Sequence, residues 1–178
     1  MGSTMRCVIS FLLLFLVCGQ ANSYIEEKIR DLISDMPNHP LNRDSEKLDR
    51  FVVNVLSAEH KTGVPWEIIV AVAYRESSLM MNKVGKLGEV GYMQIHGAAI
   101  SYCREKIGKR PRVKKSRRNN LLCGALWIQK SMDICKTDSF LNGLSMYATG
   151  KVCKPKYDGR LRWIINRRLS IARRLGYK

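Results

Sequence analysis

The stretch that decides the fold is PWEIIVAVAYRES, residues 65–77. From Pro65 to Tyr74 its only charged residue is Glu67. Such a long apolar run is typical of a helix that is buried on most sides. Pro65 suits the first position of that helix, because the amide hydrogen that proline lacks would have no partner there. We therefore predict a buried helix over Pro65–Ser78, around which the other elements must pack.

Working outward, hydrophobic residues recur at helical spacing in six other segments, and hardly any segment alternates like a half-buried strand. These helices are predicted over Tyr24–Met36, Asp44–Thr62, Gly97–Ile107, Asn119–Cys135, Phe140–Tyr147 and Arg160–Leu175. Their main connections are a glycine-containing loop, Leu79–Gly91, and a basic segment, Lys109–Arg118. The predicted fold class is mainly α, as a single compact helical domain.

Length and composition exclude several classes of protein. The chain has 178 residues, of which 46% are hydrophobic, and its formal net charge is +16. That hydrophobic content excludes a disordered polyelectrolyte or a collagen-like repeat, and a single strong apolar run excludes a polytopic membrane protein.

The apolar run lies at the N-terminus and resembles a secretory signal. Val8–Val17 is interrupted only by Ser10, Arg6 supplies a positive flank, and small residues follow at Ala21–Ser23. The run is shorter than the roughly 20 residues that a spanning helix needs. We predict a signal over residues 1–23, export to the periplasm or medium, and a mature domain over residues 24–178 with no stable membrane span. An uncleaved anchor is the alternative.

The predicted mature chain holds four cysteines, Cys103, Cys123, Cys135 and Cys153, an even number that suits two disulfides in an exported protein. Cys123 and Cys135 fall on one predicted helix about 18 Å apart, too far to be bridged. Two pairings remain, and we favour 103–123 with 135–153 because its loops are shorter. Without a C-x-x-C pair or clustered histidines, we expect no metal and no other cofactor.

Glu76 is the first candidate for chemistry. A carboxylate at the end of an apolar helix is costly to ionise, because burial and the negative end of the helix dipole both favour the neutral form. A proton-holding carboxylic acid is what a glycosidase uses to protonate its leaving oxygen. The alternative from position alone is a solvated residue at a helix end.

Two further motifs follow Glu76–Ser77: Gly88-Glu89-Val90-Gly91-Tyr92-Met93-Gln94-Ile95, and Tyr147-Ala148-Thr149-Gly150. In this order and spacing they resemble the soluble lytic transglycosylase family, with its goose-type-lysozyme-like catalytic domain. The resemblance covers about Asp44–Gly150. It implies an α+β lysozyme-like fold that is mainly helical and has a substrate cleft.

The resemblance assigns Glu76 as the single catalytic acid and base, and Ser77 as a residue that orients this acid or the substrate. It assigns five residues to the sugar cleft: Gly91, Tyr92, Met93, Gln94 and Tyr147. The sequence departs from the family pattern at Tyr92, where leucine is usual, and at Ala148, where asparagine is usual.

The implied reaction cleaves the bond between N-acetylmuramic acid and N-acetylglucosamine in peptidoglycan, with formation of 1,6-anhydro ends. The alternative is lysozyme-like hydrolysis with Glu89 as a second carboxylate. The resemblance also extends to the small transglycosylases that serve secretion systems, conjugation machinery or pili.

The positive charge is concentrated toward the C-terminus. Nine of the 15 residues in Arg104–Arg118 are basic, and the last predicted helix adds more. A basic exported protein favours polyanions such as the cell wall. We expect a monomer that binds glycan strands and no specific nucleic acid. The alternative from a different functional class is a non-catalytic basic protein that binds the cell wall or nucleic acid.

Overall fold

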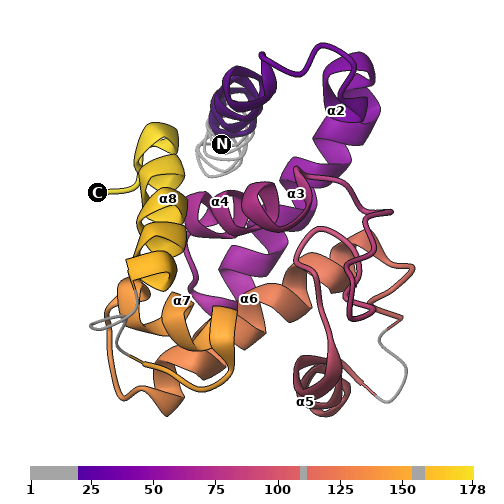
Figure 1. Cartoon of the computed structure of the whole chain (residues 1–178). Helices are drawn as coiled ribbons and strands as arrows, with labels where there is room; N and C mark the ends of the chain where they lie inside the picture. The colour runs from indigo at the N-terminus through magenta and orange to yellow at the C-terminus, as the bar shows by residue number, and fades with distance from the viewer. Residues whose placement is uncertain (1–19, 109–111, 154–158) are drawn as a thin grey trace, which may run out of the picture. The chain divides into compact units, whose positions relative to one another are not determined.

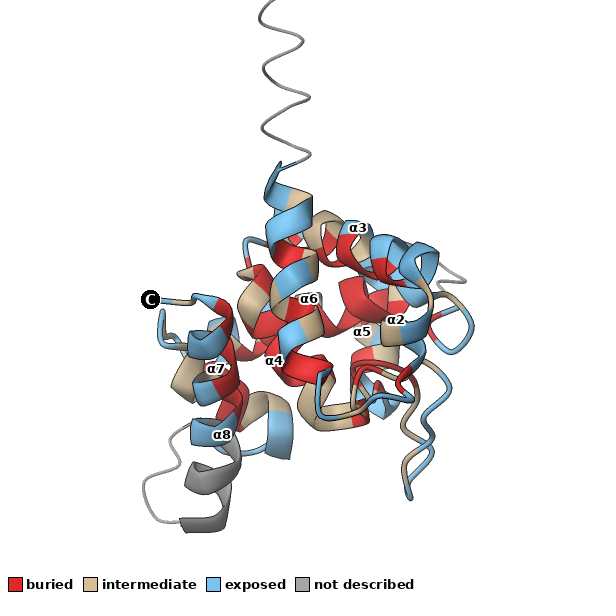
Figure 2. Cartoon of the chain, turned by 90° about the horizontal axis from the view of Figure 1, so that it is seen from above, coloured by how far each residue is buried: buried red, intermediate tan, exposed pale blue. Residues whose placement is uncertain are grey.

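The buried helix predicted from the sequence is α4, Trp66–Ser77. At its start the N–H of Trp66 donates to Oε1 of Glu59 at 3.0 Å, which replaces the side-chain cap that Pro65 cannot supply. Nearly every residue from Trp66 to Ala73 is buried, as Figure 2 shows. The helix ends where Ser78 turns into the left-handed conformation (φ 53°). The prediction for this helix is therefore confirmed.

The computed structural model describes residues 20–108, 112–153 and 159–178, with side chains from residue 166 onward in the last range. Residues 20–33 are helical. The other helices are α2 (Pro40–Arg43), α3 (Ser45–Thr62), α5 (Gly97–Ile107), α6 (Arg117–Ile134), α7 (Phe140–Thr149) and α8 (Gly159–Leu175). The predicted class, mainly α, is confirmed.

The short helix α2 is not among the predicted helices, because two prolines so close together, Pro37 and Pro40, are typical of a break between helices. Pro40 instead occupies the first turn, where proline is tolerated, and Nδ1 of His39 accepts from the N–H of Leu41 at 3.2 Å. The other helix boundaries lie within a few residues of the predicted ones.

The chain divides into two compact units, Met1–Val53 and Asn54–Lys178, and the boundary falls inside α3. Buried apolar side chains of the first unit include Ile29, Ile33, Leu41 and Leu48. The predicted signal lies mostly outside the described residues. Within the described part, no helix is long and apolar enough to cross a membrane. A single domain over residues 24–178 stays a prediction.

In the second unit, α4 packs against α8 on one side and α6 on another (Figure 1). The long helix α6 also packs against α5 and α7, and α7 contacts α8. Three side chains of α6, Leu121, Ala125 and Ile128, are completely buried. These contacts bring the C-terminal end of α4 next to α8, which places Glu76 beside the basic last helix.

Between α4 and α5 the chain forms an irregular loop rather than a strand pair. Val90 makes isolated antiparallel bridges to both Val84 and Ile95. The N–H of Ile95 donates to the Val90 carbonyl at 3.0 Å, and that of Gly91 donates to the Lys83 carbonyl at 2.9 Å. These bridges are the β structure of the described residues.

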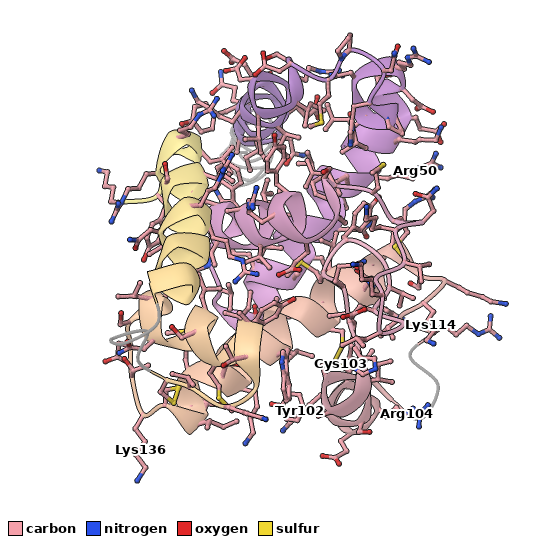
Figure 3. The ribbon with its side chains drawn as sticks, viewed as in Figure 1. Arg50, Tyr102, Cys103, Arg104, Lys114 and Lys136 are labelled. Carbon is pink, nitrogen blue, oxygen red and sulfur yellow. A yellow bond between two sulfur atoms is a disulfide. The ribbon has the colours of Figure 1, made fainter. Side chains whose placement is uncertain are left out.

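Both disulfides join the pairs favoured from the sequence. Cys103 of α5 is bonded to Cys123 of α6, and Cys135 at the end of α6 is bonded to Cys153. Cys103 and Cys123 are fully buried, and Figure 3 shows Cys103 on the side of α5 that faces α6. The shorter-loop argument therefore selected the correct pairing.

Replacing Cys103 and Cys123 together by serine is expected to lower the free energy of unfolding by about 3 kcal/mol through loss of loop closure, because the bridge spans 20 residues. Burying two serine hydroxyls adds about 1 kcal/mol or more. The matched control is the double replacement of Cys135 and Cys153, which are half-buried and close a similar loop of 18 residues. Urea denaturation of both variants checks the difference, and equal losses would contradict it.

Candidate active site

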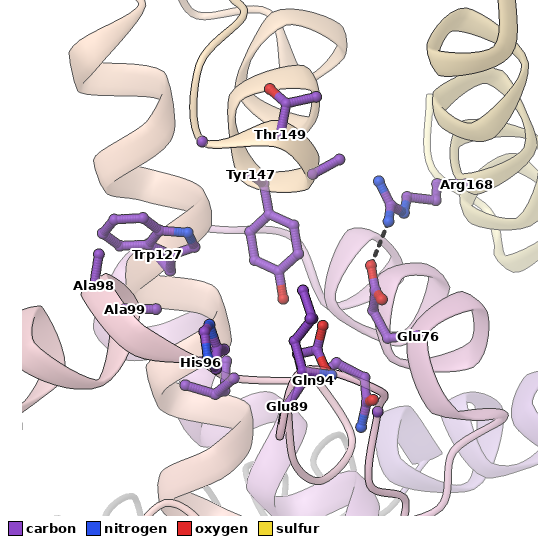
Figure 4. Close-up of a pocket in the computed structure, with 15 residues that line it drawn as sticks. Glu76, Glu89, Gln94, His96, Ala98, Ala99, Trp127, Tyr147, Thr149 and Arg168 are labelled. Atoms are coloured by element: carbon purple, nitrogen blue, oxygen red, sulfur yellow. Dashed lines mark hydrogen bonds and ion pairs between the residues drawn. The ribbon is translucent and has the colours of Figure 1, made fainter.

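A pocket of about 520 Å³ opens at the C-terminal end of α4. It is lined from the loop before α5 and from the five helices α4, α5, α6, α7 and α8. Its polar and charged lining residues include Glu76, Glu89, Gln94, His96, Tyr147 and Arg168. In Figure 4, Tyr147 lies between Trp127 on one side and Glu76 with Arg168 on the other.

Glu76 occupies the last turn of α4 and points into this pocket. Its side chain is 22% exposed, and its Oε1 forms an ion pair with Nη2 of Arg168, whose side chain is only 6% exposed. Burial and the negative end of the helix dipole, the two influences expected from the sequence, are therefore joined in the structure by a buried guanidinium in direct contact with the carboxylate.

The end of α4 is held by Ser77, the residue after Glu76. The Ser77 Oγ lies 2.9 Å from the carbonyl oxygens of both Ala73 and Tyr92, and it accepts from the N–H of Met80 at 3.2 Å. Ser77 is buried and does not line the pocket. It ties α4 to the Gly91–Gln94 segment, so it contributes to the position of the Glu76 carboxylate.

The Gly91–Gln94 segment is held from the other side by Asn120 of α6, which is completely buried. The Asn120 Oδ1 accepts from the N–H of Met93 at 3.0 Å. Its Nδ2 donates to the carbonyls of Val90 and Val113 at 3.0 and 3.1 Å. One amide side chain therefore satisfies three backbone groups and fixes the segment onto the helix.

Tyr147 of α7 completes the support of Met93. Its hydroxyl donates to the Met93 carbonyl at 2.7 Å. Burial of the phenol group, and secondly the negative charge of Glu76, raise the pKa of Tyr147 far above its ordinary value. At neutral pH the hydroxyl therefore keeps its proton and can donate this hydrogen bond. The rest of the residue is half-buried and lines the pocket.

Gln94 lines the pocket, but its amide nitrogen is already engaged. Nε2 donates to the carbonyls of Gly91 and Lys83 at 2.9 and 3.1 Å. The residue also has a φ of +46°, a left-handed conformation that is costly for a non-glycine residue and is concentrated at functional sites. The amide nitrogen is therefore bound to backbone carbonyls of the loop, while the residue still lines the pocket.

Glu89 also lines the pocket, as the second carboxylate of the described lining. Its Oε2 accepts from the N–H of Leu87 in the same loop at 2.9 Å. A carboxylate bound to its own loop has a structural reason for its position. The described residues contain no group of three His, Cys, Asp or Glu side chains that could hold a metal ion.

The structure thus sorts the predicted residues into two groups. Glu76, Gln94, Tyr147 and the alternative Glu89 line the pocket. The other four are buried beneath it, away from the lining: Ser77, Gly91, Tyr92 and Met93. Burial raises the pKa of Tyr92, although Arg117 opposes this effect.

Sequence reasoning missed Asn120, Trp127 and Arg168. Asn120 and Trp127 lie seven residues apart on the apolar stripe of α6, where an asparagine was a signal that could have been noticed. Arg168 falls four residues before Ala172, which is buried on α8. An arginine on a buried stripe has to have a partner, and that requirement was the available signal.

Gly91 offers a direct test of the packing under the site. It has a φ of +78°, and an added Cβ would lie 2.4 Å from Nδ2 of Asn120. Gly88 has a similar φ of +82° but nothing within 4 Å of an added Cβ. Both replacements by alanine carry the same left-handed strain. We expect Gly91→Ala to cost at least about 1 kcal/mol more than Gly88→Ala in thermal or urea unfolding. Equal costs would contradict the close contact.

Comparison with known proteins is consistent with this geometry. Residues 54–163 match the family model described as the transglycosylase SLT domain. This range contains all three motifs and Asn120, and it ends before Arg168. Among curated proteins, no sequence matches this chain significantly.

Proposed function

The chain belongs to the transglycosylase SLT family, and on this premise we propose that Glu76 is the single acid and base with which it cleaves glycan strands. The family consists of lytic transglycosylases, lyases that break glycosidic bonds in peptidoglycan. Enzyme class and substrate follow from this membership. The residue roles, the product and the biological setting are the proposal.

In the proposed reaction Glu76 first gives its proton to the glycosidic oxygen between N-acetylmuramic acid and N-acetylglucosamine. As the bond from this oxygen to the anomeric carbon breaks, the N-acetylglucosamine side leaves as an alcohol. Glu76, now a carboxylate, takes the proton from the 6-hydroxyl of the muramyl residue, whose oxygen attacks the anomeric carbon. The product is a 1,6-anhydro end, the carboxyl regains its proton, and no water is consumed.

The observation that carries this assignment is the position of Glu76 in the pocket wall, at a helix end fixed by Ser77 and the Asn120-bound segment. Such a rigid support keeps a catalytic group in one orientation. Glu89 is the weaker candidate because it is bound to its own loop. Its place in the pocket lining keeps hydrolysis as the second candidate reaction.

For the setting, we propose that the chain is exported through the signal over residues 1–23 and acts in the periplasm or outside the cell. A peptidoglycan substrate and two disulfides both support a compartment outside the cytoplasm. The exposed basic residues around α5 and the start of α6 would hold the enzyme near the anionic wall. The role we propose is local opening of the wall for a secretion, conjugation or pilus assembly.

The test is mass spectrometry of the fragments released when residues 24–178 are incubated with purified peptidoglycan, beside the full chain as a control for folding. Anhydro-muramyl ends from the wild type support the proposal. Reducing ends instead would support hydrolysis, with Glu89 as the second catalytic carboxylate. Release of no fragments by a folded protein would overturn the proposed reaction.

A further inference from the structure

Trp127 of α6 is an aromatic side chain of the pocket to which the proposed reaction gives no role. It lines the pocket and is half-buried, so part of the indole is accessible. In Figure 4, Trp127 and Glu76 lie on opposite sides of Tyr147. The pocket therefore extends past Tyr147 to a second wall that contains the indole.

The side chains that accompany the indole in the lining are short. Figure 4 shows Ala98 and Ala99 of α5 on the same side of Tyr147 as Trp127. The end of α7 adds three exposed lining residues, Ala148, Thr149 and Gly150. Such short side chains cannot cover an indole, so its surface stays open to a ligand that enters the pocket. Aromatic and apolar walls of this kind are typical of ligand pockets.

Tyr102 of α5 supports the indole from outside the pocket lining. The centroids of the Tyr102 and Trp127 rings lie 5.9 Å apart, and their planes are inclined by 58°, a favourable tilted arrangement. The ammonium groups of Lys106 and Lys130 lie 5.9 and 5.8 Å from the centroid of the Tyr102 ring. These cation–π contacts help to hold Tyr102. An aromatic group supported in this way loses little freedom when a ligand binds, which favours binding.

The chemistry that fits this wall is the flat face of a sugar ring. In N-acetylglucosamine and N-acetylmuramic acid the ring substituents of the β-linked strand are equatorial, so the axial C–H bonds point to the two faces of the ring. These faces are apolar, and their slightly positive hydrogens complement the negative face of an indole. A glycan strand therefore offers a matching surface at each of its sugars.

We propose that Trp127 is a substrate-binding residue whose indole face stacks on a sugar ring of the glycan strand, on the other side of Tyr147 from Glu76. This inference rests on the proposed function of the pocket. The stacked sugar holds the strand along the pocket, while a bond of the same strand lies at Glu76. Because the stacked sugar does not react, the indole binds substrate and transition state equally well. It therefore lowers KM without raising kcat.

The experiment titrates the full chain with the linear tetramer of N-acetylglucosamine and follows tryptophan fluorescence and the heat of binding. This probe presents the sugar faces but lacks the bond between N-acetylmuramic acid and N-acetylglucosamine, so binding is measured apart from the reaction. The wild type should bind the tetramer with a change in indole emission. Trp127→Leu should bind it about tenfold more weakly, the contribution of one stacked ring. On peptidoglycan this variant should raise the apparent KM by a similar factor and leave kcat nearly unchanged.

Phe140 of α7 offers a matched control, because it is also a half-buried aromatic residue paired with a tyrosine. The centroids of the Phe140 and Tyr177 rings lie 5.9 Å apart, and Phe140 is outside the pocket lining. Phe140→Leu removes a similar packing contact but should bind the tetramer as the wild type does. Trp127→Tyr keeps an aromatic ring, so it should retain most of the binding and lose the change in emission. If Trp127→Leu does not fold, the tyrosine variant still decides.

Several results would overturn the inference. The tetramer leaves the indole emission of the wild type unchanged, or the change persists in Trp127→Tyr. A folded Trp127→Leu binds the tetramer as tightly as the wild type, or both leucine variants lose binding equally. None of these results prevents the formation of anhydro ends, so the proposed reaction would stand. A wild type that binds the tetramer through Trp127 but forms no anhydro ends would instead be a failure of the proposed function.

Discussion

Glu76→Gln is expected to lower the rate of anhydro-end formation by about 10²- to 10⁴-fold, the usual contribution of a positioned general acid and base. Glutamine fits the same space and can still accept a hydrogen bond from Arg168, but it can neither give nor take the proton. We expect the variant to fold and to bind glycan strands. It should also unfold at a lower temperature, because the buried Arg168 and the neighbouring Arg75 lose the charge of this carboxylate.

Glu89→Gln is the matched comparison for that result. It removes the other pocket carboxylate while an amide oxygen can still accept from the N–H of Leu87. We expect a much smaller loss of kcat than in Glu76→Gln, measured with peptidoglycan as the substrate. A loss at Glu89 equal to or larger than that at Glu76 would contradict the single-carboxylate account.

Asn120→Leu is expected to have the second large effect, although Asn120 lies beneath the pocket. The replacement keeps the approximate volume but leaves the N–H of Met93 and the carbonyls of Val90 and Val113 buried without their partner. Three such groups cost about 3 kcal/mol or more in the free energy of unfolding. Because the same segment carries Gln94 and is tied to Ser77, activity should fall even at temperatures where the variant stays folded.

Asn120→Asp distinguishes the hydrogen bond that this side chain accepts from the two that it donates. Aspartate can still accept from the N–H of Met93, but it faces the carbonyls of Val90 and Val113 with an acceptor in place of a donor. Its loss should be comparable to that of Asn120→Leu, as measured by urea unfolding and anhydro-end formation. Stability near the wild-type value in both variants would show that Asn120 does not hold the segment.

Much of the fold follows from local patterns in the sequence. The α4 stretch is so uniformly apolar that it predicts a buried helix, as the structure shows. The helix over Gly97–Ile107 has the predicted bounds in the structure. The disulfide pairing followed from helix geometry and loop length. The short helix α2 was missed because Pro40 can both end and begin a helix, and the choice depends on the cap from His39.

The site was only partly predictable, for a physical reason. Glu76, Gln94 and Tyr147 come from motifs that are short in sequence, and they do line one pocket. Asn120 and Arg168 act across the fold, 30 residues from Val90 in one case and 92 residues from Glu76 in the other. Periodicity marks both as polar residues on buried stripes, but only packing shows which groups they reach. The sequence therefore predicts Glu76 as a candidate but does not predict the cation that contacts it.

The central claim is that Glu76 drives an intramolecular attack rather than the attack of a water molecule. The most direct measurement is cleavage of peptidoglycan in water enriched in heavy oxygen, followed by mass spectrometry of the new muramyl ends. The account predicts ends that lack one water, carry no heavy oxygen and nearly disappear in Glu76→Gln. Reducing ends that carry heavy oxygen, or anhydro ends formed equally well by Glu76→Gln, would contradict it.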